Sequence, residues 1–268
     1  MTFFEPDWMN ENEEAELEAV KKETDYSKLC KIAKNASHYL VRKEAIKKLI
    51  DQSILVDVVK NDDDNTIRKA ACLWLTDQTL LADIAKNNCN SEEVRFTAIK
   101  KLTDQTVLTD IVTKKDIDPS VREEAVCNLT DQTVLARIAK NDKNHYIRLA
   151  AIRHLTDQTV LTDIAKNSTS KHMRYTAIEK LTNQTVLTNI AKNDKDMYVR
   201  AAAVQQLTDQ TVLTDIAKND VYEEARARAV CNLTDPTVLA DIVKNKKETC
   251  KNVRWLAANK LKNYDDKL

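Results

Sequence analysis

The stretch "LTDQTVLTDIAKND" at residues 207–220 recurs along this chain with few changes. Residues 155–168 read "LTDQTVLTDIAKNS" and residues 181–194 read "LTNQTVLTNIAKND". A period of 26 or 27 residues separates the repeats, and each repeat opens on an Asp or Asn: Asp25, Asp51, Asp77, Asp104, Asp131, Asp157, Asn183, Asp209 and Asp235. A period in this range is typical of stacked supersecondary units, none of which buries its apolar face alone.

The first half of each repeat predicts a helix of about ten residues, here called helix A. In the eighth repeat, Val212, Leu213 and Ile216 share one face of a short amphipathic helix. In the ninth, Pro236 directly follows Asp235, as expected for the first helical residue after an N-cap. Asn stands ten residues after the cap in eight of the nine repeats. Because the chain has no glycine, we expect this Asn to form a left-handed C-terminal cap.

The second half of each repeat predicts helix B, which carries an arginine in every repeat. The arginines are Arg42, Arg68, Arg95, Arg122, Arg148, Arg174, Arg200, Arg226 and Arg254. Alanine stands three residues after each arginine and leucine seven residues after it. An unvarying alanine among larger apolar residues indicates close approach of helices. Predicted N-caps stand four residues before the arginine in six repeats, at Asp64, Ser91, Asp118, Asn144, Ser170 and Asp196.

The joints between repeats have a constant length. Each arginine is followed nine residues later by the cap of the next repeat. All insertions fall between helix A and helix B, near Cys89, Lys115 and Lys247. The sequence therefore predicts a stack whose variable loops lie along one edge.

Composition restricts the class of protein. The 268 residues include no glycine and three prolines, which favours an all-α fold over a sheet fold. The 42 basic and 42 acidic residues cancel, so nucleic acid is not expected as a partner. Without glycine there is no Gly-rich phosphate loop, and no nucleophile elbow or paired-carboxylate motif stands out. We predict no catalysis and no cofactor.

Cysteine usage and hydropathy concern the compartment. The six cysteines form no Cys-x-x-Cys pair, which predicts free thiols in a reducing environment. No signal-peptide pattern opens the chain, and no apolar run approaches the roughly 18 residues of a membrane span. The expected location is the cytoplasm, without membrane association. His145 and His172 occupy similar places in adjacent repeats, but they are too few ligands for a predicted metal site.

Two segments, "DPSVREEAVCNL" (118–129) and "DMYVRAAAVQQL" (196–207), resemble the second helix of HEAT-like repeats, which typically opens as Asp-x-x-Val-Arg-x-x-Ala and closes with Leu. The resemblance covers roughly residues 25–262. It implies an all-α, right-handed α–α superhelix of nine two-helix repeats. It also implies that the arginines from Arg42 to Arg254 form a ladder with acidic or backbone groups of neighbouring repeats, and this structural role is favoured over phosphate binding.

HEAT units usually run to about 40 residues, longer than these repeats. Short units also resemble leucine-rich-repeat variants in which one helix of each pair is reduced. We expect three segments: an acidic N-terminal segment (1–24), the repeats (25–262) and a C-terminal tail (263–268). Within the first, "FFEPDW" places Phe3, Phe4 and Trp8 around Pro6. This segment either caps the first repeat, which is favoured, or docks another protein.

The exposed positions of helix B vary most between repeats, whereas those of helix A repeat Gln, Thr, Asp and Lys. The positive charge of the Lys that ends helix A interacts favourably with the helix dipole, and the Asp three residues earlier is expected to pair with this Lys. In HEAT-like proteins helix B lines the concave side, so the resemblance implies a binding surface there. The candidate binding residues are Phe96, Tyr146, Leu149, Arg153, His172, Tyr175, Tyr198 and Trp255.

Clustered aromatic residues beside an arginine predict an anchoring patch for a protein or peptide partner. The alternative is that these rings cover neighbouring helices. The predicted function is a non-catalytic protein–protein interaction scaffold. The alternative function is a HEAT-like enzyme or nucleic-acid binder, similar to the DNA glycosylases or bilin lyases of that fold.

Overall fold

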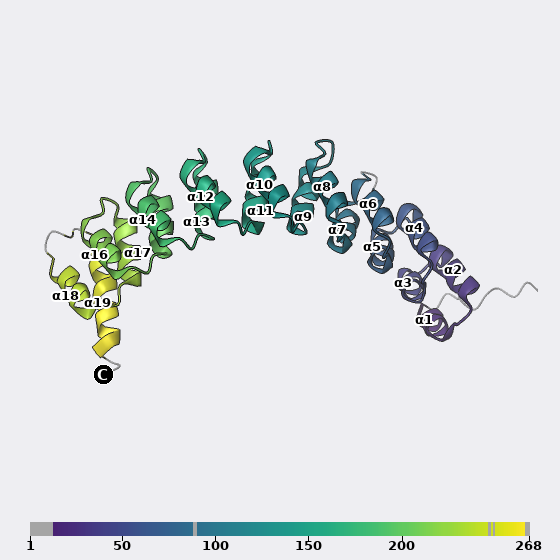
Figure 1. Cartoon of the computed structure of the whole chain (residues 1–268). Helices are drawn as coiled ribbons and strands as arrows, with labels where there is room; N and C mark the ends of the chain where they lie inside the picture. The colour runs from purple at the N-terminus through teal and green to yellow at the C-terminus, as the bar shows by residue number, and fades with distance from the viewer. Residues whose placement is uncertain (1–12, 88–89, 246–247, 249, 266–268) are drawn as a thin grey trace, which may run out of the picture. The chain divides into compact units, whose positions relative to one another are not determined.

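The computed structural model describes residues 13–87, 90–245, 248 and 250–265 (Figure 1). Within these residues it contains nineteen α-helices and no strand. The predicted all-α repeat fold is confirmed. The "FFEPDW" segment with Phe3, Phe4 and Trp8 lies outside the described residues, as do Cys89 and Lys247 of the variable loops.

After α1 (Glu13–Lys22), helices A and B alternate along the chain. The A helices are α2 (Tyr26–Asn35), α4 (Gln52–Asn61), α6 (Gln78–Lys86), α8 (Gln105–Thr113), α10 (Gln132–Asn141), α12 (Gln158–Asn167), α14 (Gln184–Asn193), α16 (Gln210–Asn219) and α18 (Pro236–Lys244). The B helices are α3 (Tyr39–Lys47), α5 (Asn65–Trp74), α7 (Glu92–Lys101), α9 (Pro119–Cys127), α11 (His145–His154), α13 (Lys171–Ile178), α15 (Met197–Gln205), α17 (Glu223–Asn232) and α19 (Lys251–Asp265). Every helix A is an α-helix of nine or ten residues, so a reduced helix is not part of this repeat.

The chain divides into an N-terminal half, residues 1–131, and a C-terminal half, residues 132–268. In both halves each helix A packs on the helix B that follows it. In the N-terminal half α1 packs on α3, and α3, α5, α7 and α9 contact one another in order. In the C-terminal half the same order holds for α11, α13, α15, α17 and α19. The described part of the acidic segment therefore covers the first helix B.

Close packing depends on the alanine of helix B. All nine of these alanines are 0% exposed: Ala45, Ala71, Ala98, Ala125, Ala151, Ala177, Ala203, Ala229 and Ala257. The leucine four residues further on is buried in eight repeats, and Leu261 in the last is half-buried. A larger side chain at the alanine position would push the helix axes apart. The predicted packing face is confirmed.

Most predicted N-caps form. The side chain of Asp64, for example, accepts the backbone N–H of Thr66, and five of the six helix B caps make such a bond. Ser170 precedes α13 as predicted, but its side chain makes no capping bond. Its backbone N–H instead donates to the hydroxyl of Ser168, 3.3 Å away. The loop before α13 is held by Ser168, and the capping role predicted for Ser170 is wrong.

The predicted left-handed Asn caps are also wrong, because no described residue has a positive φ. Asn87 and Asn245 are C-caps with φ of −81° and −68°, and the other six Asn residues end helix A from within. The helix ends when the next residue turns extended, as Asp194 does while its N–H bonds the carbonyl of Ile190. A direct turn toward helix B needs no left-handed residue. Six of the Asn residues are the last helical residue: Asn35, Asn61, Asn141, Asn167, Asn193 and Asn219.

Candidate functional site

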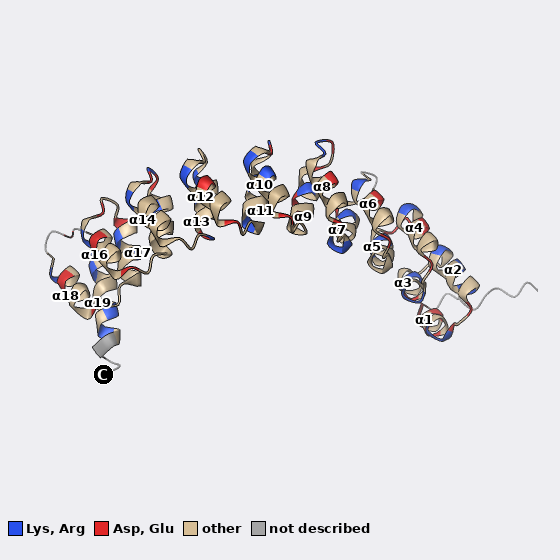
Figure 2. Ribbon diagram, viewed as in Figure 1, with Lys and Arg blue, Asp and Glu red and all other residues tan. Residues whose placement is uncertain are grey.

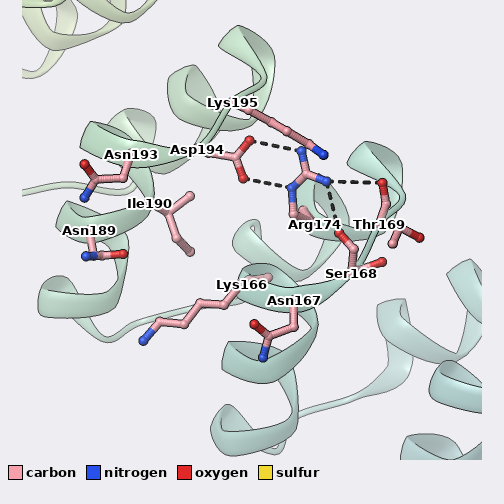
Figure 3. Close-up of a pocket in the computed structure, with 11 residues that line it drawn as sticks. Lys166, Asn167, Ser168, Thr169, Arg174, Asn189, Ile190, Asn193, Asp194 and Lys195 are labelled. Carbon is pink, nitrogen blue, oxygen red and sulfur yellow. Dashed lines mark hydrogen bonds and ion pairs between the residues drawn. The ribbon is translucent and has the colours of Figure 1, made fainter.

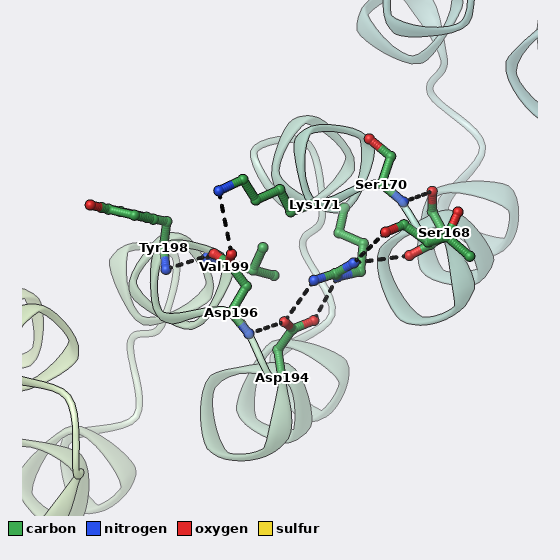
Figure 4. A network of polar contacts seen from close by, with 9 residues as sticks. Ser168, Ser170, Lys171, Asp194, Asp196, Tyr198 and Val199 are labelled. Carbon is green, nitrogen blue, oxygen red and sulfur yellow. Dashed lines mark hydrogen bonds and ion pairs between the residues drawn. The ribbon is translucent and has the colours of Figure 1, made fainter. Parts of the chain in front are cut away.

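The arginine of helix B binds two loops at once at the contact between successive repeats, here called a joint, and Arg174 shows this most fully. Arg174 on α13 donates from Nη1 to the carbonyls of Ser168 and Thr169, at 3.0 and 3.4 Å (Figure 3). Its Nε and Nη2 donate to the carboxylate of Asp194, at 2.8 and 3.0 Å. Asp194 also accepts the N–H of Asp196, at 2.8 Å, which orders the loop before α15 (Figure 4). One guanidinium therefore joins its own loop to the loop of the next repeat.

Three other arginines reach an acid of the next repeat. Arg42 pairs with Asp62, Arg200 with Asp220, and Arg226 with Glu248. Burial raises the pKa of Glu248, but its hydrogen bonds to Arg226 and to the N–H of Cys250, together with nearby cations, outweigh burial and hold the pKa below its ordinary value. These groups are nearly covered, since the Arg174 and Asp194 side chains are only 4% and 10% exposed. Loss of either partner would leave an uncompensated buried charge, so the guanidinium is held in the joint and is largely withdrawn from ligands.

The remaining arginines bond mainly to carbonyl groups. Arg95 and Arg122 donate from Nε to the carbonyls of Ala85 and Val112, at 3.0 and 2.6 Å. Arg68 and Arg148 likewise donate to carbonyls of the loops before their own helices. Arg254 is half-buried on α19. A ladder across all nine arginines remains a prediction.

A second joint uses the Gln that opens helix A, which the sequence analysis assigned only to a repetitive exposed face. Gln184 Oε1 accepts the N–H and hydroxyl of Thr208, at 3.0 and 3.2 Å, and its Nε2 donates to the carbonyl of Gln206, at 3.1 Å. The same Gln to Thr bonds recur at Gln52, Gln78, Gln105, Gln132, Gln158, Gln184 and Gln210. The constant separation of 24 or 25 residues between Gln and Thr was the available signal.

The lysines that end helix A form a third row of contacts between repeats. Five of them pair with an Asp on helix A of the next repeat: Lys34 with Asp57, Lys86 with Asp110, Lys140 with Asp163, Lys192 with Asp215, and Lys218 with Asp241. Figure 2 shows the row as blue and red segments on helices such as α8 and α12. Of these five lysines only Lys86 and Lys218 have an Asp three residues earlier, and for both of them the predicted bond to that Asp is wrong. The lysine stands at the helix end and reaches forward to the next repeat.

The exposed face of helix B differs between the two halves. In the N-terminal half, ion pairs bridge neighbouring helices: Lys69 lies 3.2 Å from Glu93, and Lys100 lies 3.8 Å from Glu124. These pairs are solvated and contribute little stability, of the order of 0 to 1 kcal/mol each. The N-terminal half also exposes Tyr39 on α3 and Trp74 on α5, whereas in the C-terminal half three adjacent B helices, α11, α13 and α15, carry aromatic rings.

These rings form what we call the aromatic strip: His145, Tyr146, His172, Tyr175 and Tyr198. The three tyrosines are 68%, 39% and 54% exposed, in chain order. The His145 ring meets that of Tyr146 edge to face at 5.8 Å and that of His172 at 6.0 Å. More than a third of each tyrosine is therefore exposed to solvent. The structure therefore brings together four of the predicted binding residues and adds His145.

Charged groups flank the Tyr198 end of the strip. The ammonium of Lys171 lies 5.8 Å from the centre of the Tyr198 ring and 3.7 Å from Asp196. In Figure 4 the Tyr198 ring points away from Asp194 and Ser168. A groove of about 400 Å³ lies here, lined by Lys171, His172, Tyr175, Asp196, Tyr198 and Val199. The sequence analysis missed Lys171, which stands one residue before a predicted binding residue.

The other predicted binding residues lie apart from the strip or are partly covered. Leu149 is half-buried and Arg153 is exposed, both on α11. Trp255 is exposed on α19, which α17 separates from α15. Phe96 is half-buried on α7 of the N-terminal half. His154 follows Arg153, and burial together with Lys180 and Arg153 lowers its pKa.

Metal ligands, apolar helices and cysteine thiols are the other features of the described residues that bear on function. In those ranges no three His, Cys, Asp or Glu side chains are grouped to hold a metal ion. No helix in the described part of the chain is long and apolar enough to cross a membrane. Cys127 and Cys231 are exposed, whereas burial raises the pKa of Cys72 to about 12.

Comparison with known proteins gives little further information. No family model and no curated protein matches the chain. Among solved structures it is similar to the X-ray structure of YibA from Escherichia coli, with 20% sequence identity. The alignment covers 94% of this chain and 97% of that one, with a TM-score of 0.40. That overlap is too weak to assign a fold or a function.

Proposed function

We propose that this chain is a non-catalytic, HEAT-like repeat scaffold that binds a protein or peptide partner on the exposed face of helix B. One observation carries the proposal: three adjacent B helices of the C-terminal half expose tyrosines. The repeated Gln residues and most of the repeated Lys residues of helix A, by contrast, bond to the next repeat. Tyrosine is enriched at binding hot spots because it supplies a large rigid ring with a polar end. The aromatic strip is the anchor of this surface.

The charges around the strip suggest the chemistry of the partner. Lys171 and Arg153 are exposed cations on α13 and α11. The nearby carboxylate of Asp196 accepts the N–H groups of Tyr198 and Val199, at 3.0 and 3.2 Å, so part of its capacity is occupied. The fitting partner is a polypeptide segment that carries apolar or aromatic side chains next to carboxylates.

A peptide-display experiment tests this proposal. The full chain is immobilised and a random peptide library is selected on it, in parallel with a variant in which Tyr146, Tyr175 and Tyr198 are all changed to Ser. We expect acidic peptides with apolar residues to be enriched on the unmodified chain only. Because a buried aromatic anchor commonly contributes about 2 kcal/mol or more, each loss weakens binding roughly 30-fold.

The matched control is Tyr39→Ser, since Tyr39 is also exposed on a helix B but lies in the N-terminal half. It should bind the selected peptides as the unmodified chain does, and all variants should melt alike. Absence of enriched peptides, or equal binding to the triple variant, would contradict the proposal. Salt-sensitive binding of single-stranded DNA that the triple variant loses would favour the nucleic-acid alternative.

A further inference from the structure

The row of Lys to Asp pairs along helix A is interrupted at one step of the C-terminal half. Lys140, Lys192 and Lys218 each pair with an Asp of the next helix A, at 2.6, 2.7 and 3.3 Å. At the step from α12 to α14 the acceptor position holds Asn189. Among the described residues, Lys166 makes no ion pair. The replacement of Asp by Asn at this position of the repeat leaves Lys166 without an acidic partner on the next helix A.

Lys60 in the N-terminal half also makes no ion pair with any described residue. Its step, however, keeps Asp83 at the acceptor position, so a carboxylate remains there. Lys166 is therefore the lysine of the row whose acid has been replaced by a neutral amide. An amide donates hydrogen bonds as well as accepting them. Asn189 therefore removes a negative charge from the contact between α12 and α14 and adds hydrogen-bond donors there.

A pocket of about 480 Å³ lies at this step (Figure 3). Three cationic side chains line it, those of Lys166, Arg174 and Lys195, together with the amides of Asn189 and Asn193. Lys166 and Lys195 are exposed and free to turn toward a ligand. The pocket thus combines exposed positive charge with neutral hydrogen-bond donors.

One carboxylate, that of Asp194, also lines this pocket. Both of its oxygens are occupied: Oδ2 accepts Arg174 Nε at 2.8 Å, and Oδ1 accepts Arg174 Nη2 at 3.0 Å and the N–H of Asp196 at 2.8 Å. Asp194 is therefore neutralised locally by Arg174, and the two lysines leave the pocket with excess positive charge.

The neighbouring pocket, at the step from α10 to α12, shows a similar frame with a smaller excess of positive charge. It has a volume of about 400 Å³ and is lined by residues that include Lys140, Arg148 and Asp163. Its lysine is held by Asp163 at 2.6 Å. The two pockets differ in the residue that faces the lysine, Asp163 in one and Asn189 in the other, and Thr169 lines the first where Lys195 lines the second.

We propose that the pocket between α12 and α14 binds a phosphate group, either free or as a monoester. Lys166 and Lys195 supply the charge, and the amides of Asn189 and Asn193 donate hydrogen bonds to the oxygens. Lysine binds phosphate as a point charge and a phosphate dianion offers acceptors in several directions, which suits donors contributed by two helices and a loop. This inference is independent of the proposed partner surface.

The test measures binding of inorganic phosphate and of a phosphoserine peptide to the full chain by calorimetry, with the unphosphorylated peptide as a third arm. Asn189→Asp restores the missing acid and should weaken binding of both phosphate probes by about tenfold or more, a loss of about 1.4 kcal/mol. Lys166→Gln should weaken it to a similar extent. Tighter binding of the phosphopeptide identifies a modified side chain as the ligand, and equal binding identifies free phosphate.

Lys140→Gln in the neighbouring pocket is the matched control and should leave phosphate binding unchanged. Asn189→Asp adds an ion pair to the row, so its melting temperature should be equal or higher, which separates loss of binding from loss of folding. The proposal is overturned if neither phosphate probe shows saturable binding. It is equally overturned if Asn189→Asp and Lys166→Gln bind as the unmodified chain does, or if the unphosphorylated peptide binds as well as the phosphorylated one.

Discussion

Single side chains set the spacing of this array at the residue scale. The helix B alanine is fully buried in all nine repeats, between helices that contact each other in sequence. Such a position has no room for further carbon atoms, because protein interiors are packed to the density of organic crystals. The size of one residue therefore determines how closely successive helices approach.

The first prediction concerns this position. Ala177→Leu should lower the free energy of unfolding by roughly 1 to 3 kcal/mol, because the added side chain overpacks the contact between α13 and its neighbours. The measurement is the denaturant midpoint in urea. Gln205→Glu, an exposed change on α15, is the control and should change the midpoint little. Equal midpoints for the two variants would show that the packing face has been assigned incorrectly.

Residue identity predicted some features and not others. The Ala spacing, the Asp caps and the arginine column follow from short-range geometry within one helix, so they could be predicted. The backbone conformation of the Asn residues could not, because it depends on where the chain goes next. Asn193 is followed by an extended residue, Asp194, that joins Arg174, and this contact is made by another repeat.

Joints between repeats are the features that matter at the scale of secondary-structure elements. Three kinds of contact recur there: the Gln to Thr bonds, the Lys to Asp pairs and the arginine bonds to the following loop. The sequence displayed all these residues, and the resemblance implied that the arginines bond to neighbouring repeats. The partners of the Lys and Gln residues also lie about one repeat away, but the Lys was assigned to an Asp of its own helix and the Gln was left without a role. The exposure of the strip could be predicted from helical phase, whereas the partial burial of Phe96 and Leu149 depends on neighbouring helices.

The second prediction concerns the Gln joint. Gln184→Ala removes the acceptor of Thr208 and a donor to the carbonyl of Gln206, and it should lower the free energy of unfolding by about 1 to 2 kcal/mol. Urea denaturation followed by circular dichroism measures the loss. Gln205→Ala is the matched control, since that exposed side chain makes no hydrogen bond among the described residues. If both substitutions have the same small effect, the Gln contacts do not stabilise the joint.

For the whole molecule, stability should be nearly a sum of terms for single repeats and for the joints between neighbours. Removal of residues 183–208 takes out α14 and α15 and connects Thr182 to Asp209, the same step that Thr208 makes in the intact chain. In the shortened chain, Asp220 follows Arg174 at the same sequence separation that Asp194 has in the intact chain. Every joint in the shortened C-terminal half keeps its partners.

The measurement that tests this account most directly is the far-ultraviolet circular dichroism and thermal melt of the chain lacking residues 183–208. We predict an unchanged helical signal per residue and a cooperative melt, because interchangeable joints allow a whole repeat to be removed. As a control, deletion of residues 183–195, which removes α14 without its partner α15, should lower the melting temperature strongly. Loss of helical signal in the whole-repeat deletion, to the level of the half-repeat control, would contradict the claim that the repeated residues encode one common joint.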